Sequence, residues 1–65
     1  MYELTFELQE NNDIYIFDCY GHFLGYLHNG ENDRIWEFFA DDTAFLVQDL
    51  RAIADKLDEL NGVAR

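Results

Sequence analysis

The chain has 65 residues and no proline, which allows one domain but not two separate hydrophobic cores. Fourteen Asp and Glu residues against four Lys and Arg residues give a formal net charge of −10. This charge opposes direct binding to nucleic acid and to anionic membranes, because phosphate groups are bound by Lys and Arg. We therefore expect a single acidic domain over residues 1–65 that is attracted to basic surfaces.

Three features bear on the compartment. The first ten residues, "MYELTFELQE", are acidic and alternating, unlike the basic start and apolar run of a secretory signal. No apolar stretch approaches the ~20 residues that span a bilayer. Cys19 is the single cysteine, so an intrachain disulfide is excluded. We expect a cytoplasmic protein in a reducing compartment, with no membrane partner.

The first predicted strand covers residues 2–9, "YELTFELQ", where apolar and polar side chains alternate. Its polar side carries Glu3 and Glu7. The next four residues, "ENND", have the composition of a turn. The segment "IYIF", residues 14–17, then predicts a second strand that is apolar on both faces.

The stretch "FDCYGHFLGYLH" gathers residue types used in metal and catalytic sites. A zinc site needs about four ligands, whereas this stretch has one thiol, and His22 and His28 would lie roughly 20 Å apart along a strand. Cys19 and His22 could act as a nucleophile pair only beside an oxyanion hole and a pocket, and no motif indicates either. Asp18 and Gly21 instead occupy the first and fourth positions of a type I turn. We interpret the stretch as a hairpin turn with a half-buried cysteine.

The third strand is predicted at residues 22–27 and the fourth at residues 34–39, "RIWEFF". The fourth segment is rich in residues that favour strands. A short helix is the alternative there, because Ile35, Phe38 and Phe39 also fit a helical spacing.

A helix is predicted over residues 43–60. Its apolar stripe recurs every three or four positions: Leu46, Leu50, Ile53, Leu57 and Leu60. Asp42 or Thr43 is the expected N-cap, and "NG" at residues 61 and 62 the expected C-terminal stop.

These elements predict an α+β fold, a small antiparallel sheet of three to four strands with one C-terminal amphipathic helix packed on one face. The helix is expected on the face that carries Leu4, Phe6 and Leu8. The opposite face, with Glu3 and Glu7 beside aromatic residues of the later strands, would stay open for a protein partner or a second copy.

Other motifs do not indicate chemistry. Adjacent acids such as Asp41 and Asp42 lack the cleft that a catalytic dyad requires. The segment "GHFLG" is not followed by the helix of a phosphate site. The segment "NGENDR" resembles a calcium loop faintly but has no closing glutamate, so a weak calcium site is only an alternative. The sequence predicts no catalytic residue, no metal site and no cofactor.

The acids are expected to form definable surfaces. Besides Glu3 and Glu7 on the first strand, several are predicted at the start of the helix or on its solvent side: Asp41, Asp42, Asp49, Asp55, Asp58 and Glu59. Carboxylates on a rigid scaffold can imitate a nucleic-acid backbone, so that basic residues that normally hold phosphates would bind them. Aromatic side chains near Tyr15, Tyr26 or Trp36 are expected to anchor the contact.

In its size, acidity and aromatic content, the chain resembles small phage-encoded inhibitors of host defence. Anti-CRISPR proteins belong to this group, and several of them act as nucleic-acid mimics. The resemblance implies a non-enzymatic inhibitor that binds a host nucleic-acid-binding protein, such as a CRISPR effector subunit, inside a bacterial cell. The residues expected to contact this partner are the eight acids named above and one aromatic residue, Trp36.

The alternative function is a structural or assembly module that self-associates through the open sheet face. In that case the protein is a homodimer rather than a monomer, its affinity for itself barely depends on salt, and its acids serve solubility alone.

Overall fold

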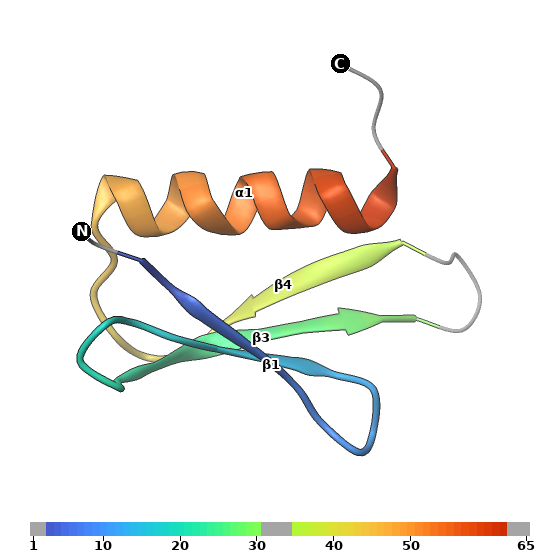
Figure 1. The fold of residues 1–65 in the computed structure, drawn as a ribbon, viewed down its shortest axis with the longest axis horizontal. Helices are drawn as coiled ribbons and strands as arrows, with labels where there is room; N and C mark the ends of the chain where they lie inside the picture. Colours follow the sequence, from blue (N-terminus) through green and yellow to red (C-terminus); the bar gives the residue numbers. More distant parts are fainter. Residues whose placement is uncertain (1–2, 31–34, 63–65) are drawn as a thin grey trace.

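The computed structural model describes residues 3–30 and 35–62. The elements, in chain order, are β1 (Thr5–Leu8), β2 (Ile14–Phe17), β3 (Phe23–Asn29), β4 (Trp36–Ala40) and α1 (Val47–Asn61). The strands form one antiparallel sheet in the order β1-β2-β3-β4. Helix α1 lies along one side of this sheet (Figure 1). The predicted α+β fold is confirmed.

The predicted strands differ from the observed ones mainly at their ends. Strand β2 has the predicted bounds, and β1 is shorter than predicted at both described ends. Strand β3 extends to Asn29, because His28 and Asn29 pair with Glu37 and Trp36 of β4. The fourth segment is a strand and not a short helix. Residues 2 and 34, where two strands were predicted to begin, lie outside the described residues.

The core lies between the sheet and α1. Ile14 and Ile16 of β2, Leu24 and Leu27 of β3, and Ile53 of α1 are each less than a tenth exposed. Burying a side chain of this size contributes about 1.5–3 kcal/mol to stability. Partly buried apolar side chains surround this cluster: Leu4, Phe6, Trp36, Phe38, Phe45, Leu57 and Leu60. Leu4 and Phe6 therefore lie on the helix side as predicted, whereas Leu8 is 70% exposed.

Strand β3 contains a β-bulge at Leu24. Phe17 pairs with Phe23 and Ile16 pairs with Gly25, so Leu24 is the extra residue between the two pairs. Leu24 is 2% exposed and belongs to the core. The bulge therefore adds an apolar side chain to the helix side of the sheet.

Gly25, which follows the bulge, lies against β4. Its φ of 144° is a conformation that residues with a side chain rarely adopt. A Cβ atom at this position would overlap the carbonyl oxygen of Phe39 and lie 2.9 Å from Cε1 of Phe38. The sheet can hold this register only with glycine here.

The start of α1 was predicted wrongly. Its N-cap is Leu46, not Asp42 or Thr43. The N–H of Leu46 donates a hydrogen bond of 2.9 Å to the carboxylate of Asp49, which is 2% exposed. The placement of Asp49 on the solvent side of the helix is therefore also wrong. Its carboxylate accepts from an N–H at the helix start and, in the first turn, lies near the positive end of the helix dipole.

The apolar stripe of α1 is buried only in part. Ile53 is 2% exposed, whereas Leu46 and Leu50 are 53% and 49% exposed. The helix is turned toward the flank that carries Lys56, whose ammonium group lies 5.4 Å from the ring centroid of Phe6. Because the alkyl chain of a lysine can cover apolar surface, Lys56 contributes to the contact with β1. The flank of the helix that carries Leu50 faces outward.

The end of α1 is fixed to the sheet. Gly62 has a φ of 68° and forms the C-cap, which confirms the predicted stop. The side-chain amide of Asn61 accepts a hydrogen bond of 2.7 Å from the N–H of Trp36 and donates one of 3.3 Å to its carbonyl. These two bonds hold the start of β4 against the end of the helix.

We expect Gly25→Ala to lower the free energy of unfolding by about 2–4 kcal/mol, because the methyl group overlaps β4 in an unfavourable backbone conformation. Urea unfolding followed by circular dichroism measures the change. The control is Gly21→Ala, where φ is also positive but no atom lies within 4 Å of the added methyl group. Equal losses in the two variants would contradict the packing of Gly25 on β4.

We expect Asp49→Ala to lower the free energy of unfolding by about 1–2 kcal/mol through loss of its capping hydrogen bond. Asp55→Ala removes the same charge from an exposed position of α1 and should change stability by less than about 0.5 kcal/mol. The same urea titration compares the two variants. An Asp49→Ala variant with the free energy of unfolding of the parent protein would show that stability does not depend on this cap.

Candidate functional site

The side of the sheet that faces away from α1 carries a set of aromatic rings. We name it the aromatic face and define it by five residues of three strands: Tyr15, Phe17, Phe23, Tyr26 and Phe39. The rings lie there because the residues that alternate with them point into the core. Within the described part of the chain, no helix or strand covers this side (Figure 1).

Neighbouring rings of the aromatic face pack against one another. The ring centroids of Tyr15 and Phe23 are 5.1 Å apart, and those of Phe17 and Phe23 are 5.7 Å apart. Tyr26 stacks on Phe39 at 5.2 Å with an angle of 16° between the ring planes. Tyr15 and Tyr26, at 6.3 Å, join the two groups. These separations are typical of favourable aromatic pairs. Phe39, at 42%, is the most exposed of the five rings.

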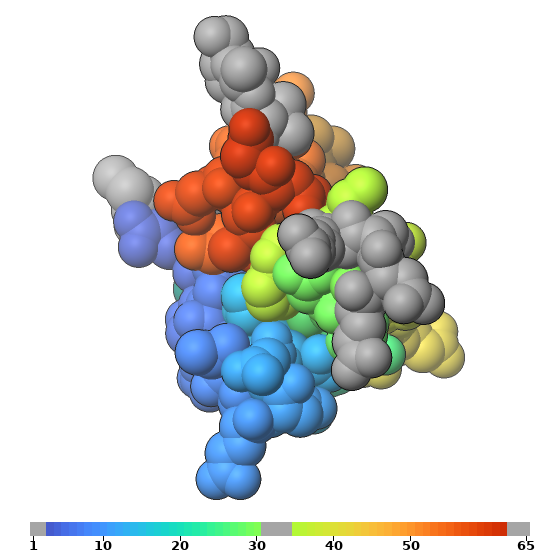
Figure 2. Space-filling view, turned by 90° about the vertical axis from the view of Figure 1, so that its right-hand side faces the viewer, coloured from blue at the N-terminus to red at the C-terminus, as the bar shows by residue number. Residues whose placement is uncertain are grey.

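Carboxylates border the aromatic face. Glu7 of β1 pairs directly with Tyr15 across the strands. Glu37 of β4 pairs with His28, on the side of the sheet that carries the rings. Asp13, just before β2, contacts Nδ1 of His28 at 2.7 Å. The turn between β1 and β2 extends away from the helix, as the end view shows (Figure 2).

No lysine or arginine of residues 3–30 and 35–62 lies on the aromatic face. The two that these ranges contain, Arg51 and Lys56, are on α1. Aromatic ring faces attract cations, and carboxylates attract them more strongly. Among the described residues, the basic side chain on this side of the sheet is His28, which contacts Asp13 and lies across from Glu37.

The acids predicted to bind a partner do not form one surface. Glu3 and Glu7 are exposed, and Glu7 borders the aromatic face. Asp55 and Glu59 are exposed on α1, and Asp58 is half-buried there. Because α1 covers the opposite side of the sheet, one flat partner cannot touch both groups.

The remaining predicted acids lie in or after the connection from β4 to α1. Asp41 and Asp42 are exposed, and the N–H of Asp41 still donates to the carbonyl of Leu24 at 3.0 Å. Asp49 is buried at the start of α1. The prediction missed Glu37 and Asp13. Side chains alternate along a strand. Assigning this segment firmly as a strand would therefore have placed Glu37 on the side of the sheet away from Trp36 and Phe38.

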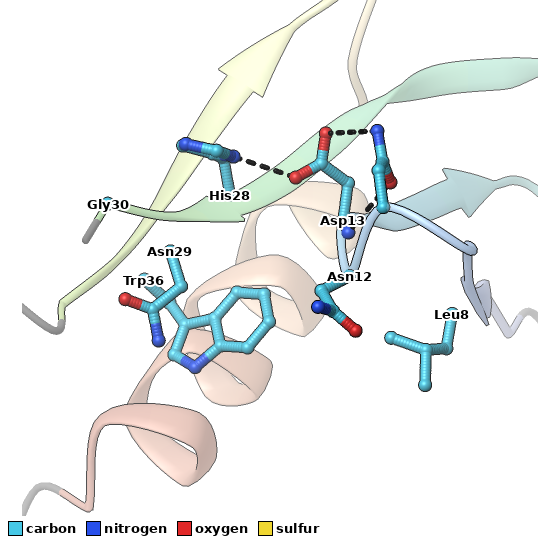
Figure 3. Close-up of a pocket in the computed structure, with 8 residues that line it drawn as sticks. Leu8, Asn12, Asp13, His28, Asn29, Gly30 and Trp36 are labelled. Atoms are coloured by element: carbon cyan, nitrogen blue, oxygen red, sulfur yellow. Dashed lines mark hydrogen bonds and ion pairs between the residues drawn. The ribbon is translucent and has the colours of Figure 1, made fainter.

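Trp36 lies on the helix side and lines a pocket of about 460 Å³. The pocket is formed by the turn between β1 and β2, the end of β3 and the start of β4 (Figure 3). Side-chain amides of Asn12 and Asn29 lie around the indole ring, and the Asp13–His28 pair lies at its upper margin. The described residues that line it include no serine, cysteine or lysine, and its two titratable side chains, Asp13 and His28, contact each other.

The turn predicted after β2 is confirmed, but the burial predicted for its cysteine is wrong. The N–H of Gly21 donates to the carbonyl of Asp18 at 3.0 Å. The carboxylate of Asp18 accepts from the N–H groups of Tyr20 and His22, at 2.8 and 2.9 Å. Cys19 is exposed rather than half-buried, because Asp18 turns inward to hold the backbone and leaves the next side chain outside.

The pKa of Asp18 reflects this geometry. Desolvation works to raise it, but the backbone N–H groups of His22 and Tyr20, together with the His22 imidazole, outweigh that effect. The pKa of Asp18 is therefore below its ordinary value of 3.8. His22 and His28 bind separate aspartates, Asp18 and Asp13, and share no site.

No three His, Cys, Asp or Glu side chains in residues 3–30 and 35–62 are grouped so that they could hold a metal ion. No helix in the same ranges is long and apolar enough to cross a bilayer.

Comparison with known proteins gives no match. No protein family, no curated protein and no solved structure matches this chain.

The lowered pKa of Asp18 predicts a pH effect on stability. A carboxyl group that is more acidic in the folded chain stabilises it above the unfolded pKa, and this contribution is lost as pH falls through the folded pKa. We expect Asp18→Asn to lower Tm near neutral pH, and the difference from the parent protein to shrink below about pH 4. Thermal unfolding from about pH 7 to pH 2.5 measures it. Asp42→Asn, the same change at an exposed position, is the control, and a pH-independent Asp18→Asn difference would contradict the prediction.

Proposed function

We propose that this protein is a non-enzymatic inhibitor that binds a basic, nucleic-acid-binding surface of a host protein in the bacterial cytoplasm, as a nucleic-acid mimic. A CRISPR effector subunit is the first target to test. The observation that supports the proposal is the aromatic face, an uncovered set of rings bordered by Glu7 and Glu37 in a chain of net charge −10. No cofactor takes part.

The properties of the aromatic face suit a protein partner. Tyrosine is enriched where interfaces gain most of their binding energy, and Tyr15 and Tyr26 lie near the middle of this face. Their rings are already held by neighbouring rings, so little side-chain entropy is lost on binding. The bordering carboxylates would select a basic partner and exclude an acidic one.

The acids of α1 would act at a distance. Asp55 and Glu59 are on the far side of the sheet from the aromatic face. They add to the negative field of the whole protein, which accelerates the encounter with a basic surface and weakens as salt is added. Asp49 has no part in binding, because its carboxylate is buried at the helix start.

Self-association through the aromatic face is the second candidate function. A symmetric dimer would bring the same face of two copies together. The carboxylates of Glu7, Asp13 and Glu37 from both copies would then meet around the same rings, with no lysine or arginine of the described residues between them. Like charges placed together oppose association, so the charge favours a basic partner over a second copy.

The test is retention of host proteins by the tagged full chain. A lysate of a bacterium that carries CRISPR and other defence systems is applied at low and high salt, with and without added DNA, and retained proteins are identified by mass spectrometry. We expect a nucleic-acid-binding complex that is lost at high salt and displaced by DNA. Phe39→Leu, which removes the most exposed ring of the face, should reduce retention severalfold, whereas Asp55→Asn should not.

The purified target then provides the direct measurement. Its affinity for labelled DNA should fall as the inhibitor is added, and fall less with the Phe39→Leu variant. A retained partner that is indifferent to salt and DNA would overturn the proposal. So would a stable dimer in sedimentation experiments, unchanged by salt and with no other protein retained, which would establish the second candidate function instead.

A further inference from the structure

The rings and carboxylates of the aromatic face form an ordered row across the sheet. Glu7 pairs with Tyr15, Tyr15 with Tyr26, and Tyr26 with Phe39. The row therefore runs from edge strand β1 to edge strand β4 and begins with a carboxylate. Glu37 lies two residues before Phe39 on the same side of β4, so a second carboxylate stands beside the other end of the row.

This row contains two places where a flat cation would fit. Beside β1, the ring of Tyr15 adjoins the carboxylate of Glu7, its direct cross-strand neighbour. Beside β4, the ring of Phe39, stacked on Tyr26, adjoins Glu37 and the imidazole of His28, which is the cross-strand partner of Glu37. Cross-strand neighbours and residues two apart on one side of a strand lie about 5–7 Å from each other. A single side chain can therefore touch a ring and a carboxylate at once.

The chemistry of these two places favours arginine over lysine. A guanidinium group is planar and weakly hydrated, stacks on aromatic faces and can donate two parallel hydrogen bonds to a carboxylate. An ammonium group is compact and strongly hydrated, so it gains less from a ring face. Phe39 stacks on Tyr26 by one ring face, and its other face, on edge strand β4, is where a planar group would stack.

We propose that the aromatic face binds an arginine-rich segment of the partner protein, with one guanidinium group on Tyr15 and Glu7 and a second on Phe39 and Glu37. This inference rests on the proposed function, whose basic partner it specifies. Tyr15 and Phe39 lie two strand spacings apart, about 10 Å. Arginines at every third position of a polyproline II segment have nearly this separation and point the same way.

The test uses the full chain and two labelled peptides that are identical except for their cations. One has arginine at every third position and the other has lysine at the same positions, with glycine and serine between. Fluorescence polarisation gives the affinity for each. Both peptides experience the same net charge of the protein, so general attraction cancels in the ratio. We expect the arginine peptide to bind about five- to thirtyfold tighter, as two added cation–π contacts would give.

Variants of the aromatic face test whether its residues cause the preference for arginine over lysine. Phe39→Leu and Tyr26→Leu should each bring the ratio of the two affinities toward one, by weakening the arginine peptide more than the lysine peptide. Glu37→Gln should weaken the arginine peptide more than Asp55→Asn, which makes the same charge change on α1. Circular dichroism shows that each variant is folded. If Tyr26→Leu unfolds, Phe39→Leu, at a position already 42% exposed, still decides the result.

The possible results separate this inference from the proposed function. An arginine preference that disappears in Phe39→Leu supports the inference even if no nucleic-acid-binding protein is retained from lysate. Equal affinities for the two peptides, or a preference that Phe39→Leu and Glu37→Gln leave unchanged, would overturn it. In that case a salt-sensitive host target would still support the proposed function, with charge rather than arginine recognition as its basis.

Discussion

One helix of 15 residues covers one side of a sheet of four strands, and the arrangement of the side chains follows from this constraint. A side chain on β2 either packs beneath α1, as Ile14 and Ile16 do, or points to the uncovered side, as Tyr15 and Phe17 do. On the uncovered side, rings limit their contact with water by packing on one another. This ring packing also stabilises the sheet on the side that α1 does not cover.

The carboxylates, which the amino-acid composition presents as one class, have three different roles. Asp49 caps the helix and is buried, and Asp18 holds the backbone of a turn. Glu7 and Glu37 leave their charge at the border of the aromatic face. These four carboxylates therefore differ in exposure and in the groups that they contact, although the composition counts them alike.

The strands and the open face could be predicted because alternation is a local property that each strand expresses by itself. The start of α1 could not be predicted in this way. Asp42 and Thr43 are residue types that favour the N-cap position, whereas the observed N-cap is Leu46, several residues further along the connection from β4 to the helix. Asp49 was misplaced for the same reason. Glu37 was missed because its segment also fitted a short helix, so that alternation was not followed along it. The bulge at Leu24 could not be predicted because it depends on the register between β2 and β3.

The order β1-β2-β3-β4 means that every strand pairs with the next strand along the chain. Each pairing therefore closes a short loop, and the loss of chain entropy on forming it is small. Topologies of this kind fold quickly for their size, and a chain without proline has no slow isomerisation step about X–Pro bonds. The chain order of the strands and the absence of proline therefore both favour rapid folding.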